Sequence, residues 1–301
     1  MDLQALADFN LVAAHGGFGR ASRVTGRPKA TLSRRVAELE QSLGVRLIER
    51  GAHSLRLTEE GRTLHARTEG LLDEITEAGE TIMSGAAIPR GRLRVSAPIV
   101  FAHVALSRIG ARFARAYPQV ELEIVAEDRT VDPVDDGYDL VIRIDPAPDE
   151  RLVGRQILND ERLLVASPAL ASPLLESGTA EPLRVEAVMM MTATPVGTVW
   201  RVRTGAGGVR SLSPAPVLRL SSLLMVRDAV VAGAGAGLLP KLLVADDLRV
   251  GRLVSWATDD NPPVAIWALQ NSRRLVGAKV RAFLDALTEA FPSKTFDAGR
   301  I

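Results

Sequence analysis

Near the N-terminus, two helical patterns are joined by a short glycine-containing turn. Apolar residues at helical spacing predict a helix over 2–14, and a shorter helix follows over about 19–24. Gly26 then marks a turn, and Pro28 suits the first turn of a third helix. That helix carries one apolar stripe, formed by Leu32, Val36, Leu39 and Leu43. Two helices joined in this way are typical of a helix-turn-helix unit, which constrains residues 1–58 to a small, mainly helical domain.

The charge of this segment favours nucleic acid as its partner. The whole chain has a formal net charge of only +1, but no acid lies between Arg20 and Ala37. Arg34 falls opposite the apolar stripe and could bond guanine in bidentate fashion, whereas Lys29 and Arg35 are expected to meet phosphates. The alternative is a basic face that is merely solvated, since several glutamates follow the patch. The candidate DNA-binding residues are Arg23, Arg27, Lys29, Ala30, Thr31, Ser33, Arg34 and Arg35.

After Gly44, the pattern predicts a β-hairpin wing. Leu47–Ile48 and residues 55–57 have the character of two short strands around a glycine-containing turn. Arg50, His53 and Arg56 lie on this hairpin, where they could touch the DNA backbone. We therefore expect an N-terminal winged helix-turn-helix.

The residues of this region resemble those of LysR-type transcriptional regulators. The resemblance rests on FNLVAAHGGFGRAS, KATLSRRVAELEQSLGVRLIER and LRLTEEG, and it continues through GRLRVSAP (91–98), YPQVELEI (117–124), YDLVIRI (138–144) and AGAGAGLLP (232–240). It thus covers almost the whole chain. The resemblance implies a dimer, often paired into tetramers, and a C-terminal domain of two α/β lobes like those of type-2 periplasmic binding proteins.

A long helix is predicted over the connector, residues 59–88. Thr58 can cap it, and apolar or small residues recur at alternating spacings of four and three. This seam comprises Leu57, Gly61, Leu64, Thr68, Leu71, Ile75, Ala78 and Ile82. A single helix with a narrow apolar seam needs a partner, so we expect a homodimer that presents two recognition helices to an inverted-repeat operator. The alternative is that the helix packs on its own body.

Strand and helix patterns alternate over residues 91–301, which predicts an α/β domain with a parallel or mixed sheet. Strands are expected over 93–97, 120–126, 140–144, 163–167 and 266–270, and helices over 104–117, 223–232 and 276–291. The resemblance implies lobe I over 91–162 and 268–301, and lobe II over 163–267. Ligands of open α/β sheets bind beyond the carboxyl ends of strands. Together with the resemblance, which implies an effector held between the two lobes, this points to an organic acid or aromatic effector near Ser96, Pro98, Val100, Arg143, Thr194 and Ser222, although each could be structural.

An enzyme and a periplasmic solute-binding protein are the rival classes. The Gly233–Gly237 run follows a helical pattern instead of a strand, so it does not fit a dinucleotide loop, and the four histidines have no ligand spacing. A solute-binding protein would carry a signal peptide and no basic head. The chain has no cysteine, which excludes disulfides. We expect a cytoplasmic regulator that works with RNA polymerase, without enzyme activity, cofactor, metal or membrane contact.

Overall fold

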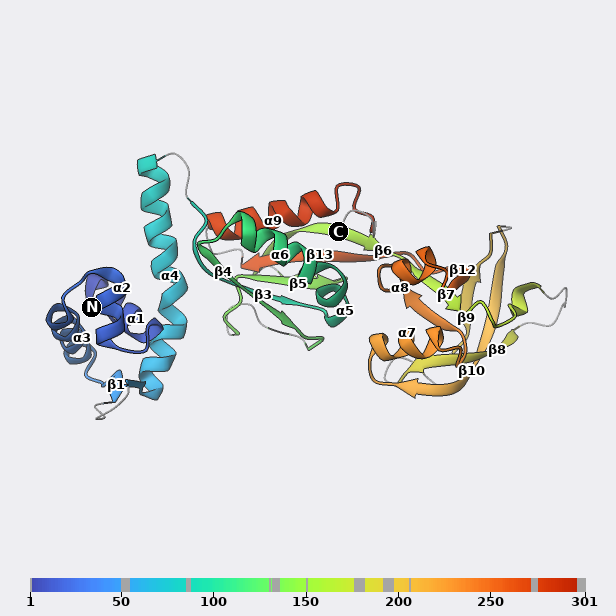
Figure 1. Ribbon diagram of the computed structural model, residues 1–301, viewed down its shortest axis with the longest axis horizontal. Coiled ribbons are helices and arrows are strands. Elements are labelled where there is room, and N and C mark those ends of the chain that lie inside the picture. Colours follow the sequence, from blue (N-terminus) through green and yellow to red (C-terminus); the bar gives the residue numbers. More distant parts are fainter. Residues whose placement is uncertain are drawn as a thin grey trace. The chain divides into compact units, whose positions relative to one another are not determined.

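A computed structural model describes residues 2–49, 55–84, 88–129, 131, 136–149, 151–175, 182–191, 198–205, 207–271 and 276–296, with backbone only at 73, 74 and 76–84. The chain forms two units, Met1–Ile88 and Pro89–Ile301, and each is described by itself. Their elements are labelled in Figure 1.

The first unit begins with helices α1 (Leu3–Ala14), α2 (Phe18–Thr25) and α3 (Lys29–Leu43). Leu6, Phe9 and Val12 of α1 form its core with the apolar stripe of α3. Leu32, Val36 and Leu39 are buried as predicted, but Leu43 is 36% exposed because α3 ends there, at Gly44. Gly44 adopts the left-handed conformation (φ +71°) that lets a glycine terminate a helix.

The wing is a short antiparallel pair, β1 (Ile48–Glu49) and β2 (Arg56–Leu57). Glu40 on α3 fixes its start, because its Oε1 accepts hydrogen bonds from the backbone N–H groups of Leu47 (2.8 Å) and Ile48 (3.1 Å). Both strands lie within one residue of the predicted hairpin. Arg50 and His53 fall outside the described residues.

The long helix α4 (Glu59–Ser84) begins at Thr58, whose hydroxyl accepts a hydrogen bond from Gly61 N–H as predicted for its cap. The first half of the expected dimer seam packs on the chain's own head. Leu64 contacts the head core, and Thr68 Oγ1 accepts a hydrogen bond from Asn10 Nδ2 on α1 (2.9 Å). The start of the seam therefore covers α1 of the same chain. Leu71 and Ile75 stay 44% and 56% exposed.

Lobe I of the second unit is built on a mixed sheet of strand order β4-β3-β5-β13-β6. Its strand β3 is parallel to β4 and β5, whereas β13 is antiparallel to β5 and β6. The strands are β3 (Gly91–Ala97), β4 (Val120–Ala126), β5 (Leu140–Ile144), β6 (Leu152–Asp160) and β13 (Val264–Asn271).

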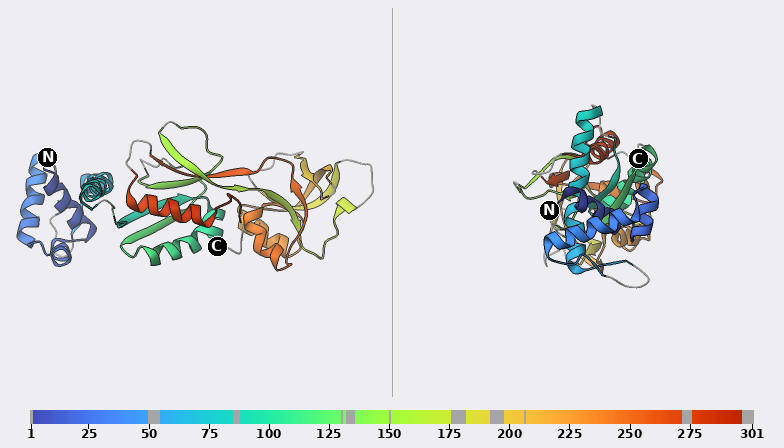
Figure 2. Two further views of the ribbon diagram at one scale, coloured as in Figure 1. Left: turned by 90° about the horizontal axis from the view of Figure 1, so that it is seen from above. Right: turned by 90° about the vertical axis from the view of Figure 1, so that its left-hand side faces the viewer.

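One face of this sheet is covered by α6 (Ser107–Ala116) and α9 (Ala278–Ala290), which lie side by side in both views (Figures 1 and 2). Phe113 on α6 meets Phe283 on α9 edge to face, with ring centroids 5.1 Å apart. The segment α5 (Ile99–Phe101) and the π-helical turn η1 (Ala102–Leu106) lead into α6, so the helical stretch begins five residues before the predicted 104.

Lobe II contains a sheet of order β11-β7-β12-β9-β10-β8, in which only β8 and β10 pair in parallel. Helices α7 (Leu223–Val231) and α8 (Lys241–Arg249) cover one face, and the 3-10 turn η2 (Pro173–Leu175) packs near the other. The strands are β7 (Arg162–Ala166), β8 (Leu183–Met190), β9 (Trp200–Arg203), β10 (Val209–Leu220), β11 (Gly237–Pro240) and β12 (Val254–Asp259).

The chain passes between the two sheets twice. The first passage joins β6 to β7 at Asp160–Arg162, and the second joins β12 to β13 between Asp259 and Val264. The second passage therefore precedes the boundary at 267/268 given in the sequence analysis, because β13 pairs with β6 along its whole length. Among the described residues, none of the helices combines the length and apolar character that a membrane crossing requires.

Candidate functional site

The polar side of α3 is open at the surface of the first unit. Lys29, Ala30, Ser33 and Arg34 are exposed, and Thr31 is half-buried. The Arg34 side chain is 68% exposed, and its only ion pair with a described residue is a long contact of 3.4 Å with Glu38 one turn further along the helix. Such an exposed i,i+4 pair contributes little stability, so the Arg34 guanidinium is available to a partner.

Arg27 and Arg35 are held by one buried carboxylate. Asp8 on α1 is fully buried and bonds the Nη1 atoms of Arg27 and Arg35, the latter at 3.1 Å. The arginine side chains themselves remain 45% and 32% exposed. A charge-assisted bond to a buried acceptor fixes a long side chain that would otherwise sample many rotamers. Asp8 thus connects α1 to the turn before α3 and to α3 itself.

Asp8 was not predicted as part of the DNA-binding region, although the sequence carries a signal for it. Asp8 precedes Phe9 in the apolar pattern of the first helix, whose residues form the core. An acid buried at such a position requires a cationic partner. Arg23 is exposed on α2 and Arg56 is exposed on the wing, so both remain open to solvent.

In lobe I, Arg143 lies at the end of β5 beside a buried polar cluster. Its Nη2 donates to Ser96 Oγ (3.2 Å), and Ser96 Oγ in turn donates to Glu127 Oε1 (2.9 Å). Tyr138 also donates to Glu127 Oε1 (2.7 Å). Ser96 is completely buried, so β3 and β5 bring together two residues that the sequence placed far apart. Glu127 and Tyr138 were not predicted.

The surroundings stabilise the charged form of Glu127 but not that of Arg143. Burial by itself would raise the pKa of Glu127, but hydrogen bonds from Tyr138, Ser96 and Arg129 outweigh it, and the pKa is lowered. Burial lowers the pKa of Arg143. Among the described residues, Arg143 makes no ion pair with an acid, and the nearby Glu127 carboxylate is bonded by Arg129 (2.5 Å). A partly buried guanidinium without an acid partner attracts an anion.

A pocket of about 870 Å³ adjoins Arg143. Its walls come from the end of β5, the segment after β4 and the proline-containing segment before β6, and they include Asp128, Arg129, Val141, Ile144 and Leu269. This volume suits a small organic ligand. The described lining residues all belong to lobe I.

The other predicted effector residues take different positions. Pro98 is buried before α5, and Val100 packs against the cores of both lobes. Ser222 caps α7, since its Oγ accepts a hydrogen bond from Leu224 N–H, which is the structural role left open for it. Thr194 lies outside the described residues. Of the five predicted effector residues that the structure describes, Ser96 and Arg143 are bonded to each other.

A helix-turn-helix with an open basic face, followed by a domain of two α/β lobes, defines a ligand-responsive DNA-binding regulator. The family model of the bacterial regulatory helix-turn-helix protein, lysR family, matches residues 3–62, and that of the LysR substrate binding domain matches residues 86–292. The chain belongs to the LysR family of transcriptional regulators, as the sequence resemblance indicated.

Relatives match along nearly the whole chain. The regulator PtxR of Pseudomonas aeruginosa is 30% identical over 98% of this chain and 95% of its own length. Full-length CrgA of Neisseria meningitidis, a LysR-type transcriptional regulator, is 26% identical, covers 96% of this chain and 98% of its own, and has a TM-score of 0.55. Full-length AphB, a virulence activator of Vibrio cholerae, is 27% identical over 97% of this chain and 100% of its own, with a TM-score of 0.53.

Proposed function

We propose that this chain reads an operator of inverted-repeat sequence through α3 and responds to a small organic anion bound near Arg143. The observation that carries the first part is the exposed Arg34 on the helix face opposite buried Leu32 and Val36. In a helix-turn-helix, that face enters the major groove, where an arginine reads guanine. Arg27, Arg35 and Lys29 then meet phosphates and set the position of the helix.

The test is a binding assay on DNA that the wild-type protein selects from a random-sequence library. Arg34→Ala should lower the preference for selected over scrambled DNA by roughly 10- to 100-fold, since one bidentate base contact contributes about 1–3 kcal/mol of discrimination. Arg67→Ala, which removes an equal charge from an exposed position on α4, should leave the preference unchanged. Full discrimination by Arg34→Ala would refute the proposed recognition.

We further propose a dimer through the distal part of α4. Leu71 and Ile75 continue the apolar seam beyond the residues that pack on the head, and both are exposed in the single chain. A partner helix would bury them and would present two heads to the two halves of the operator. Ile75→Asp should shift the protein toward monomers in sedimentation velocity and weaken operator binding. Unchanged sedimentation would place the dimer contact elsewhere. A tetramer would need a second contact surface, because the dimer already buries Leu71 and Ile75.

The proposed effector is a small carboxylate. Support comes from the Arg143 guanidinium, which has no acid partner among the described residues and borders an 870 Å³ pocket. A thermal-shift screen of mono- and dicarboxylates should yield a stabilising compound whose effect disappears in Arg143→Gln. Arg155→Gln, which alters an exposed pair with Asp285 in the same lobe, is the matched control. Equal stabilisation of both variants would exclude Arg143 as the effector residue.

An effector that prefers one arrangement of the two lobes would change the operator complex only by its differential affinity for the two arrangements. The proposed output is altered recruitment of RNA polymerase, in the cytoplasm where bacterial DNA is transcribed. We propose no catalytic role for any residue.

A further inference from the structure

The contact between α1 and α4 in the first unit contains a buried polar side chain. Asn10 of α1 is 6% exposed, and its amide is fully used. The amide nitrogen donates to the Leu6 carbonyl oxygen (3.0 Å) and to Thr68 Oγ1 (2.9 Å), and Oδ1 lies 2.7 Å from His65 Nδ1. Two residues of α4, 55 and 58 positions away in the sequence, therefore meet on one amide of α1.

The direction of each hydrogen bond follows from its neighbours. The Leu6 carbonyl can only accept, so the NH₂ group of Asn10 faces it and Oδ1 faces His65. The His65 Nδ1 atom must then carry the proton. Thr68 donates its own hydroxyl hydrogen to the Leu64 carbonyl oxygen (2.7 Å), so its oxygen accepts from Asn10. The donors and acceptors thus fit together in one arrangement.

Such a network fixes the register of α4 on α1. The apolar contacts of Leu64 and Leu72 with the head core have no direction, so they would survive a small shift of the helix. The hydrogen bonds would not, because a shift by one residue moves α4 by about 1.5 Å along its axis and about 100° around it. Buried donors would then lack acceptors. Buried polar side chains select the register of paired helices for the same reason.

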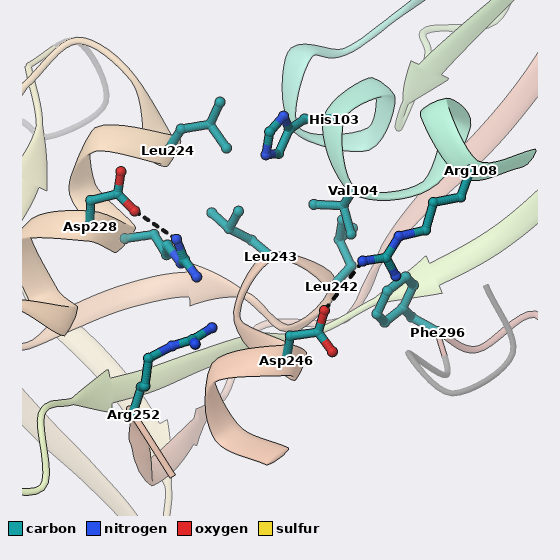
Figure 3. Close-up of a pocket in the computed structure, with 11 residues that line it drawn as sticks. His103, Val104, Arg108, Leu224, Asp228, Leu242, Leu243, Asp246, Arg252 and Phe296 are labelled. Carbon is teal, nitrogen blue, oxygen red and sulfur yellow. Dashed lines mark hydrogen bonds and ion pairs between the residues drawn. The ribbon is translucent and has the colours of Figure 1, made fainter. Parts of the chain in front are cut away.

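The two lobes of the second unit meet through a different kind of contact. Arg108 on α6 and Asp246 on α8 form an ion pair of 3.6 Å, and their side chains are 51% and 41% exposed (Figure 3). Water can replace either partner of such a pair, so the pair permits movement. The contact between α1 and α4 is buried and directional instead, and it therefore holds one geometry.

The register at Asn10 determines where the exposed part of the seam points. Leu71 and Ile75 lie at i+3 and i+7 from Thr68, on the same face of α4. A tilt of about 10° at Thr68 displaces the end of α4, roughly 24 Å away, by about 4 Å. One base pair of DNA rises by about 3.4 Å. In a dimer joined at the distal part of α4, the same tilt moves each head by about one base pair.

We propose that Asn10, His65 and Thr68 are positioning residues that hold the head on α4 and thereby set the spacing between the two operator half-sites. None of the three contacts DNA in this proposal, since Asn10 is buried and its two partners face α1. The inference rests on the proposed dimer through the distal part of α4, because half-site spacing is a property of two linked heads.

The test compares matched substitutions at Thr68 in the full-length protein. Thr68→Val keeps the shape of the side chain but removes the oxygen that Asn10 requires, whereas Thr68→Ser retains this oxygen. Each protein selects from a library in which two copies of the half-site preferred by the wild type are separated by different lengths of DNA. Thr68→Val should lower the preference for the best spacing over one that differs by a base pair at least fivefold. Thr68→Ser should select like the wild type.

Binding to a single half-site separates positioning from general damage to the head. Thr68→Val leaves α3 unchanged, so its affinity for one half-site should stay within twofold of the wild type. His65→Leu should repeat the loss of spacing preference, and His65→Asn should restore it, because the asparagine amide nitrogen replaces the Nδ1 donor. An equal loss of half-site and operator binding with unchanged spacing preference would show a merely structural role and overturn the proposal.

A distance measurement tests the same contact without requiring a dimer. The chain has no cysteine, so Gln41→Cys and Arg67→Cys place one spin label on α3 and one on α4, both at exposed positions. With the labelled protein diluted into an excess of unlabelled protein, pulsed electron resonance reports the distance within one chain. The distribution of distances should be narrow in the wild type and in Thr68→Ser, and at least twice as wide in Thr68→Val.

The two measurements distinguish this inference from the proposed dimer. If the wild type selects only single half-sites, the dimer through α4 is wrong, and the distance distributions decide the positioning role by themselves. If Thr68→Val shows the spacing preference or the distance distribution of the wild type, the positioning role is overturned.

Discussion

The replacement Asp8→Asn separates positioning from simple charge in the DNA-binding head. The change adds one unit of positive charge to the head, so Coulomb attraction alone would tighten DNA binding. In the structure, however, Asp8 is the acceptor that fixes Arg27 and Arg35. The asparagine oxygen can serve one arginine, but its amide NH₂ turns a donor toward the other. We therefore expect weaker binding to the selected operator despite the added charge.

The size of the effect follows from the two bonds. Hydrogen bonds to charged groups contribute about 1.5–3 kcal/mol each, but the two arginines are 45% and 32% exposed, so water recovers part of the loss. We expect the head to lose about 2 kcal/mol of stability. Hydrogen exchange of the α1 and α3 amides in the full-length protein should then accelerate roughly 30-fold.

The control is Asp2→Asn, which also removes one acid from the head. Asp2 is the exposed cap of α1 and accepts a bond from Gln4 N–H, a role that asparagine fills equally well. If Asp8→Asn exchanges its amides at the wild-type rate and binds the operator as tightly as Asp2→Asn does, the positioning role is refuted.

Two further changes test the fold. Asp160 lies at the end of β6, and burial raises its pKa to about 7 from 3.8. Between these two values the folded state holds a proton that the unfolded chain has lost. The free energy of unfolding should therefore fall by about 4 kcal/mol as pH rises from 4 to 8. Asp160→Asn keeps an oxygen for Leu242 N–H and should flatten this dependence in urea unfolding at pH 5 and 8; parallel profiles would contradict the assignment. Gly61→Ala would put a Cβ 2.1 Å from the Leu47 carbonyl oxygen and should destabilise the head by more than 2 kcal/mol in thermal unfolding, whereas Gly19→Ala, with open space around it, should be neutral or stabilising. Equal melting temperatures for the two variants would show that the wing and α4 do not pack as described.

Local pattern was sufficient for most elements of the protein. The strands over 120–126 and 140–144 and the helix α3 occupy the predicted positions, because hydrophobic periodicity reports which face of an element is buried. The glycine run after α7 follows a helix, as expected, and leads into β11. Strands β6, β8, β9, β10 and β12 and helix α8 were not predicted, since none of them was recognised from the pattern of its own residues.

The sequence by itself determined the family, through motifs spread along almost the whole chain. It also determined the helix-turn-helix and the exposed face of α3, since these depend on residues within one or two helical turns of each other. Tertiary structure alone decided that the start of the α4 seam serves its own head, that Asp8 holds Arg27 and Arg35, and that Arg143 meets Ser96. Such contacts join residues 19 to 58 positions apart. Periodicity tells which face of an element is buried but not what buries it, so these pairings emerge only when the elements pack.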